Sequence, residues 1–274
     1  MTQSTSSTTS GGERTLARSV SPRSVALPAE HGSWSLVTEP ILLGLLAAPT
    51  WAGLTLAVAA FAVFLFNRPF KVYWSDRRRG RVYERTALAR RFWLLYGGIA
   101  LTFAAVAFAI AGWRPFAPFL VAAPLLLIFA YYDHRPGRYW QAELAAPAAF
   151  ASVAAAIVLA GGWDWEPALA LWGFMTARAV PAVLFIRARL RLDKGKPTSI
   201  AGVLLAHLAA LVGITLLYVG HLLPATAILA ALILLARAIW GLSPYRWRST
   251  AKALGFLETG YGLLAVFLVA LGFG

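Results

Sequence analysis

Long apolar stretches alternate with short polar ones along most of the chain. Nine apolar stretches occur, at residues 34–48, 50–66, 92–112, 115–132, 142–162, 166–187, 199–219, 222–240 and 254–273. An α-helix needs roughly 17–25 apolar residues to cross a bilayer, and most of the nine reach that length. The first is short and contains Glu39 and Pro40. The pattern predicts an all-α, polytopic integral membrane helix bundle with about nine transmembrane helices.

The basic residues between these stretches follow a second alternation. With the N-terminus inside, 22 of the 25 Lys and Arg residues fall in the inner segments. These segments are 1–33, 67–91, 133–141, 187–198 and 241–253. Lys and Arg accumulate on the cytoplasmic side of membrane proteins. We therefore predict a multi-pass protein of the bacterial cytoplasmic membrane, with a cytoplasmic N-terminus and the C-terminus outside.

Composition narrows the classes of function. The net charge of +14 would indicate a nucleic-acid partner in a soluble protein, but 59% of the residues are hydrophobic and the charge follows the positive-inside asymmetry. We therefore predict no nucleic-acid partner. The chain has no Cys, which excludes disulfides and thiol chemistry. We expect residues 1–30, rich in Ser, Thr and Gly, to be a disordered cytoplasmic tail, and residues 31–274 to form a single transmembrane domain.

Several charged residues lie within or near the ends of the predicted spans. They are Glu39, Glu143, Arg178, Arg237 and Glu258. A charge at the centre of a span costs at least about 2.5–3.5 kcal/mol on insertion scales, so it needs a partner or water. Arg178 lies about 13 Å along a helix from Arg187, near the middle of the bilayer, and we expect it to line a polar cavity. For Glu143, Arg237 and Glu258 we expect pairing within the bundle or snorkelling.

A His and a Glu stand together just before the first apolar stretch. Residues 27–34 read Leu-Pro-Ala-Glu-His-Gly-Ser-Trp. One interpretation is a helix start at the membrane interface, with Ser33 as its N-cap. The alternative is a proton-handling pair of Glu30 and His31, which makes His31 a candidate site residue. There is no second His nearby to suggest a metal site.

Two predicted helices end in basic clusters at the inner side. If the helix over 166–187 continues, Arg187 and Arg191 share a face at i and i+4 and bring two guanidiniums within reach of one phosphate. Asn67, Arg68 and Lys71 occupy the matching exit of the second helix. The two clusters are candidates for converging on one anionic ligand. The alternative is that they serve only as topology signals.

The opening LPAEHGSWSLVTEPILLGLL, with the following NRPFKVYWSDRRRGR, resembles the YwiC-like family of bacterial membrane proteins. The resemblance runs from residue 27 to about residue 240. Its most specific part is the opening of the form PxEHGSW followed by EPxLLG. The family has no established biochemical role that would assign a function.

The chain also resembles, more distantly, the UbiA superfamily of intramembrane prenyltransferases. That resemblance implies nine helices, a cytoplasmic N-terminus, and two acidic motifs that hold Mg²⁺ on a prenyl diphosphate. Pro40 to Gly44 mirrors an early motif of the superfamily, and Asn67 matches the first position of the first acidic motif. Basic or neutral residues replace the expected acids, namely Arg68, Lys71, Ser75, Arg187 and Arg191. Only Asp76 and Asp193 remain as nearby carboxylates.

These substitutions change the expected chemistry. Mg²⁺ takes oxygen ligands, whereas Arg and Lys bind phosphate directly. Our leading hypothesis is therefore a UbiA-like bundle with a cytoplasm-facing basic pocket, which binds the head group of a membrane lipid or an isoprenoid phosphate. No cofactor is predicted, and the sequence identifies neither a catalytic residue nor an oligomeric state.

Two alternatives remain open. One is a small-solute or anion transporter, which would need an outward path through spans whose outer halves contain almost no polar residues. The other is a prenyltransferase that uses Mg²⁺ at Asp76 and Asp193.

Overall fold

The computed structural model describes residues 21–28, 33–80, 82–133, 135 and 139–274, and the regular elements of this part are all helices. In chain order they are α1 (Pro22–Ala26), α2 (Ser33–Ala47), α3 (Trp51–Arg78), α4 (Glu84–Ala111), the 3-10 turn η1 (Arg114–Phe116), α5 (Ala117–Asp133), α6 (Trp140–Ala160), α7 (Trp165–Asp193), α8 (Ile200–Val219), α9 (Ala225–Leu242) and α10 (Ala251–Leu271). The expected all-α bundle is confirmed.

Each of the nine predicted apolar stretches corresponds to one helix or to a helix with its leading 3-10 turn. Eight of these helices, from α3 to α10, are long and apolar enough to cross a membrane. Helix α2, with 15 residues, is the short first span expected from the sequence. The chain is therefore a multi-pass helical membrane protein.

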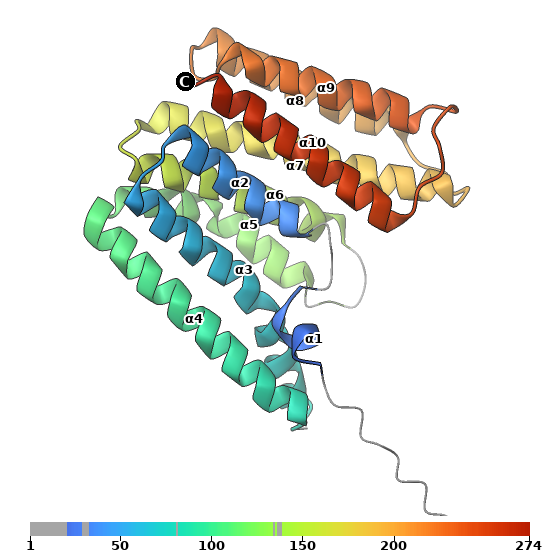
Figure 1. Cartoon of the computed structure of the whole chain (residues 1–274). Coiled ribbons are helices and arrows are strands. Elements are labelled where there is room, and N and C mark those ends of the chain that lie inside the picture. The colour runs from blue at the N-terminus through green and yellow to red at the C-terminus, as the bar shows by residue number, and fades with distance from the viewer. Residues whose placement is uncertain (1–20, 29–32, 81, 134, 136–138) are drawn as a thin grey trace, which may run out of the picture.

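Successive long helices run back and forth between two ends of the bundle. The C-terminal ends of α3, α5, α7 and α9 lie at one end with the N-terminal ends of α4, α6, α8 and α10, on the right in Figure 1. We call this the basic end, because the described residues of the basic segments gather there. The chain's C-terminus and the connections of α2 to α3, α4 to α5, α6 to α7 and α8 to α9 lie at the opposite end.

Helix α6 is the central helix of the bundle. Its apolar window is 78% buried, against 11% for α4 at the periphery. Alanines dominate its surface, and α2, α3, α5 and α7 all pack on it. A Cβ at Gly44 of α2 would lie 2.8 Å from the Cβ of Ile157, so the glycine permits the close approach of these two helices. Small residues at helix crossings provide the van der Waals packing that stabilises bundles in lipid.

Exposed aromatic residues mark both ends of the bundle. Trp74, Trp140, Trp240 and Trp247 are exposed at the basic end, and Trp51 and Trp113 at the opposite end. Tryptophans of this kind concentrate at the two membrane–water interfaces. Between the two ends, exposed apolar side chains such as Leu101, Leu127 and Leu216 form a surface suited to lipid.

The basic segment 67–91 was expected to connect the second and third spans on the inner side, and most of this connection is helical. Helix α3 continues to Arg78 and α4 begins at Glu84. Emergence from the bilayer does not end a helix, because the backbone hydrogen bonds stay paired in water. The Phe70 ring of α3 also stacks on Trp74 and packs edge-on against Trp93 of α4, which extends the hairpin. Only residues 79–83 connect the two helices.

Part of the tail expected to be disordered is helical. Residues Pro22–Ala26 form α1, and its Val25 and Ala26 are buried where α1 packs on α3 and α4. Arg68 Nη2 on α3 donates to the Ser24 carbonyl oxygen at 3.4 Å. Residues 1–20 and 29–32, and with them the expected Glu30–His31 pair, lie outside the described residues.

Candidate ligand-binding site

Helix α7 continues through the basic cluster at its C-terminal end. It runs to Asp193, so Arg187 and Arg191 lie on one helix and share a face. Both side chains line a groove of about 500 Å³ at the basic end, between α7 and the start of α8. The helix over 166–187 thus continues as the sequence analysis required, and the two guanidiniums can bind one ligand together.

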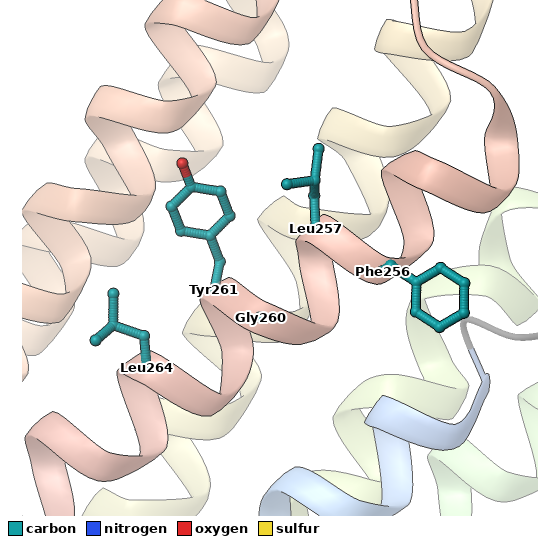
Figure 2. A pocket seen from close by; sticks show the side chains of 5 residues that line it. All are labelled: Phe256, Leu257, Gly260, Tyr261 and Leu264. Atoms are coloured by element: carbon teal, nitrogen blue, oxygen red, sulfur yellow. The ribbon is translucent and has the colours of Figure 1, made fainter.

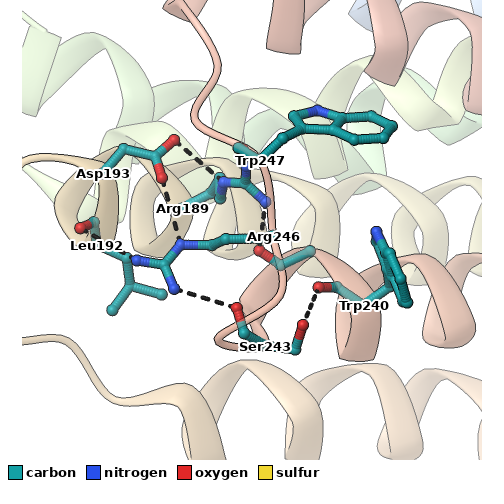
Figure 3. A network of polar contacts seen from close by, with 8 residues as sticks. Arg189, Leu192, Asp193, Trp240, Ser243, Arg246 and Trp247 are labelled. Atoms are coloured by element: carbon teal, nitrogen blue, oxygen red, sulfur yellow. Dashed lines mark hydrogen bonds and ion pairs between the residues drawn. The ribbon is translucent and has the colours of Figure 1, made fainter.

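Arg189 lies on a different face of α7 and has a structural role. Its Nε donates to Asp193 at 3.1 Å, and its terminal nitrogens donate to the carbonyl oxygens of Gly241 and Trp247. Arg246 reaches the same carboxylate, with Nε 3.3 Å from Asp193 Oδ1 (Figure 3). This network attaches the end of α7 to the connection between α9 and α10. It fixes the helix segment that presents Arg187 and Arg191.

The groove is lined by both polar and apolar side chains. The polar part comes from Arg187, Arg191, Thr198 and Ser199, and the apolar part from Leu184, Ala188 and Val203. None of the lining residues carries a carboxylate. Ser199 also caps α8, since its Oγ accepts a hydrogen bond from Gly202 N at 3.1 Å. The N-terminal end of α8 thus borders the groove and adds the positive end of a helix dipole.

Each of the two groove arginines has a contact that orients it. Arg191 Nε donates to the Pro197 carbonyl oxygen at 3.0 Å, which folds the connection 194–199 against the helix end. Arg187 Nη1 lies 2.6 Å from Glu143 Oε2 on α6. The Arg187 side chain is still 39% exposed, so this pair leaves the guanidinium accessible to a ligand. The contact with Glu143 was not anticipated from the sequence.

The other predicted basic cluster is not part of this groove. Arg68 contacts α1, the Lys71 ammonium lies 5.6 Å from the ring centre of Phe129 on α5, and Asn67 is half-buried on α3. None of the three lines the groove. The expected convergence of the two clusters on one ligand is therefore not seen at this site.

The two carboxylates of the alternative metal site are both engaged by arginines. Asp76 is buried and accepts from Arg85 at 2.7 and 3.0 Å and from the Thr86 hydroxyl at 2.8 Å. Asp193 accepts from Arg189 and Arg246. Over the described residues, no group of three or more acidic, His or Cys side chains is arranged to hold a metal ion. The present contacts of both aspartates are structural.

A second polar centre lies inside the bundle, where Glu39 and Arg178 meet. Arg178 Nη1 on α7 is 2.8 Å from Glu39 Oε2 on α2, and the two side chains are 4% and 1% exposed. Arg178 Nη2 also donates to the Glu258 carbonyl oxygen at 3.0 Å. Arg178 was expected to line a polar cavity, whereas the structure pairs it within packed helices. Its charge is compensated locally by Glu39.

His207, Arg237 and Glu258 extend this centre. Together with Glu39 and Arg178 they form what we call the ionic cluster. Arg237 on α9 forms a buried ion pair with Glu258 on α10. Its Nη2 lies 3.2 Å from His207 Nε2 on α8, and its guanidinium lies 4.2 Å from the Phe185 ring centre. Five helices thus contribute to one buried cluster.

Two residues of this region were missed by sequence reasoning. His207 is an isolated polar residue in an apolar span, which is the one signal that could have pointed to it. Gly262 on α10 gives no such signal, although a Cβ there would overlap Arg178 Nη2 and Glu39 Oε1. Its role depends on which helices cross, and a single sequence does not show that.

A second groove, of about 380 Å³, lies along α10 (Figure 2). Leu257, Tyr261 and Leu264 line it with Phe256 and Gly260. The Tyr261 hydroxyl is the one polar side-chain group among these five residues. The lining suits apolar chains, and it lacks the cations that would recognise an anionic head group.

Comparison with known proteins identifies one family. Residues 27–158 match the model of the YwiC-like protein family. The resemblance to that family is therefore confirmed for this part of the chain, and its extension to about residue 240 stays a prediction. No curated protein matches the chain. No solved structure matches it either, so the likeness to the UbiA superfamily finds no support.

Proposed function

We propose that this membrane protein, with its YwiC-like N-terminal half, binds the phosphate head group of an anionic lipid in the groove between α7 and α8. The observation that carries the proposal is the position of Arg187 and Arg191, side by side on one groove wall. The basic end faces the cytoplasm of a bacterial cell, so the groove opens to the inner leaflet. The N-terminus is then cytoplasmic and the C-terminus outside.

The composition of the groove matches an amphiphile rather than a free ion. Two guanidiniums and two hydroxyls in the lining suit the oxygens of a phosphate, since Arg donates to phosphate with two parallel bonds. Leu184, Ala188 and Val203 in the same lining suit a hydrocarbon chain. An isoprenoid phosphate and a phospholipid share this chemistry. Recognition by arginine alone needs no carboxylate-bound Mg²⁺.

The proposal is tested by titrating the protein in detergent with a prenyl monophosphate and, separately, with phosphatidylglycerol. A hydrogen bond to a charged group is worth about 1.5–3 kcal/mol. The double variant Arg187→Ala, Arg191→Ala should therefore weaken binding by roughly tenfold to a hundredfold or more. EDTA should leave the affinity unchanged. The lipid that binds more tightly identifies the source of the head group.

The matched control is Lys194→Ala with Lys196→Ala. Both lysines are exposed at the same end and do not line the groove, so this variant removes the same charge without touching the site. Glu143→Gln releases Arg187 from its ion pair and should raise the affinity. Binding that is lost with EDTA and survives removal of both arginines would contradict the proposal and favour a metal site.

The orientation is tested with single cysteines, for which the chain has no native background. Tyr245→Cys at the basic end should react with a membrane-impermeant thiol reagent only from the cytoplasmic side. Asp164→Cys at the opposite end should react only from outside. Both positions are exposed, and Asp164 avoids the positive φ of the neighbouring Gly162. Labelling of Tyr245→Cys from outside would reverse the assignment.

A further inference from the structure

The ionic cluster and the groove are linked by contacts of two cluster residues, His207 and Arg237. His207 is linked to Val203, a groove residue, through a 2.9 Å contact between its Nδ1 and the Val203 carbonyl oxygen. Arg237 packs on Phe185, which is next to the groove residue Leu184. The cluster therefore touches the groove lining at Val203 and lies against a direct chain neighbour of Leu184.

The cluster is electrically balanced but incompletely hydrogen-bonded. Two carboxylates face two guanidiniums, which gives a formal charge of zero when His207 is neutral. Neutral His207 fits its contacts, because Nδ1–H donates to Val203 and Nε2 then accepts from Arg237. Glu39 Oε1 and Glu258 Oε1 are buried and have no hydrogen-bond partner, while the other oxygen of each carboxylate is in an ion pair. A buried carboxylate without a full set of partners is destabilised by desolvation and is relieved by taking up a proton.

Glu39 is the better proton acceptor of the two carboxylates. The charged groups that face it are Arg178 from α7 and the like charge of Glu258 from α10. Glu258 pairs with Arg237 from α9 in the same way, but its side chain is 6% exposed, against 1% for Glu39. Two neighbouring carboxylates disfavour each other's ionised form and burial disfavours it further, so the more deeply buried carboxylate binds the proton first.

We propose that the ionic cluster is a proton-binding site, in which a proton from water is bound by the Glu39 carboxyl. Occupancy gives the cluster a net charge of +1 next to the groove lining. The coupling of this charge to an anionic lipid in the groove rests on the proposed function, whereas the proton site itself does not. Because such coupling is reciprocal, lipid binding also favours proton uptake.

The size of the coupling follows from the separation of the two sites. Arg178 and Arg187 lie about 13 Å apart along α7 at the helical rise. One unit charge at that distance, in an effective dielectric of about 20, changes affinity for an anion roughly fivefold to tenfold. Phosphatidylglycerol is a suitable probe, because its phosphodiester keeps one charge across the range.

The proton site is tested by infrared difference spectroscopy of the full chain between about pH 5 and about pH 9. The wild-type protein should show the carbonyl absorption of a buried protonated carboxyl at the acidic end. The absorption should be absent in Glu39→Gln and present in Glu143→Gln, whose carboxylate is outside the cluster. Absence of the absorption from the wild-type protein, or its survival in Glu39→Gln, would overturn the proposal.

The coupling has its own readout. Phosphatidylglycerol should bind the wild-type protein roughly fivefold to tenfold more tightly at the acidic end, and Glu39→Gln should abolish this pH dependence. If the infrared signal is present but the affinity does not change with pH, the proton site stands and the coupling is wrong. If the affinity is also insensitive to Arg187→Ala with Arg191→Ala, the lipid site of the proposed function has failed instead.

Discussion

Replacing Gly262 by alanine should lower the free energy of unfolding by about 3 kcal/mol or more, although the change adds a single methyl group. The added Cβ would overlap Arg178 Nη2 and Glu39 Oε1, so the ion pair must separate or α10 must shift. Both side chains are almost fully buried, so bulk water does not reach them if they part. Breaking a buried ion pair in this way typically costs about 3–5 kcal/mol.

Gly260→Ala is the matched control for this change. Gly260 lies two residues earlier on α10, and nothing lies within 4 Å of a Cβ built there. Alanine is the better helix former by up to about 1 kcal/mol, so this variant should be as stable as the wild type or slightly more stable. Unfolding in a mixed detergent series, followed by tryptophan fluorescence, measures both variants. Equal stability of the two would mean that α10 does not cross the Glu39–Arg178 pair.

Removing the Arg178 charge alone should lower the free energy of unfolding by a similar amount. Arg178→Leu leaves the Glu39 carboxylate buried without its ion-pair partner, and we expect a loss of about 3–5 kcal/mol. The double variant Glu39→Leu, Arg178→Leu removes both charges and should recover most of that loss, since a buried ion pair can often be replaced by apolar residues.

The single variants Arg178→Leu and Glu39→Leu form a thermodynamic cycle with the double variant. The losses in free energy of unfolding of the two single variants should not add up to that of the double variant. Each single variant leaves the other residue's charge buried without its partner. Additive losses would show that Glu39 and Arg178 do not interact in the folded protein.

The positions of the helices could be predicted from the sequence because apolar length and charge alternation are local properties. Even the short first span and the shared face of Arg187 and Arg191 followed from residue spacing. The ends of α3 and α4 could not be predicted in this way, because hydropathy shows where a chain leaves the bilayer and not where a helix ends. The role of Arg189 was also missed, although its helical position places it away from Arg187 and Arg191.

The ionic cluster could be predicted only as a set of separate charges. Glu39 and Arg178 are 139 residues apart, and their pairing depends on α10, which contacts both α2 and α7. The same is true of Glu143 and Arg187, which face each other across α6 and α7. Contacts of this kind arise from tertiary packing, and neither periodicity nor composition encodes them.

Native mass spectrometry of the purified protein with its co-purified lipid tests the central claim most directly. The account predicts a bound phosphate-bearing lipid on the wild-type protein and on Lys194→Ala with Lys196→Ala. The lipid should be lost from Arg187→Ala with Arg191→Ala, while treatment with EDTA changes none of the three spectra. Equal retention of the lipid by all three proteins would contradict the assignment of the groove between α7 and α8 as the binding site.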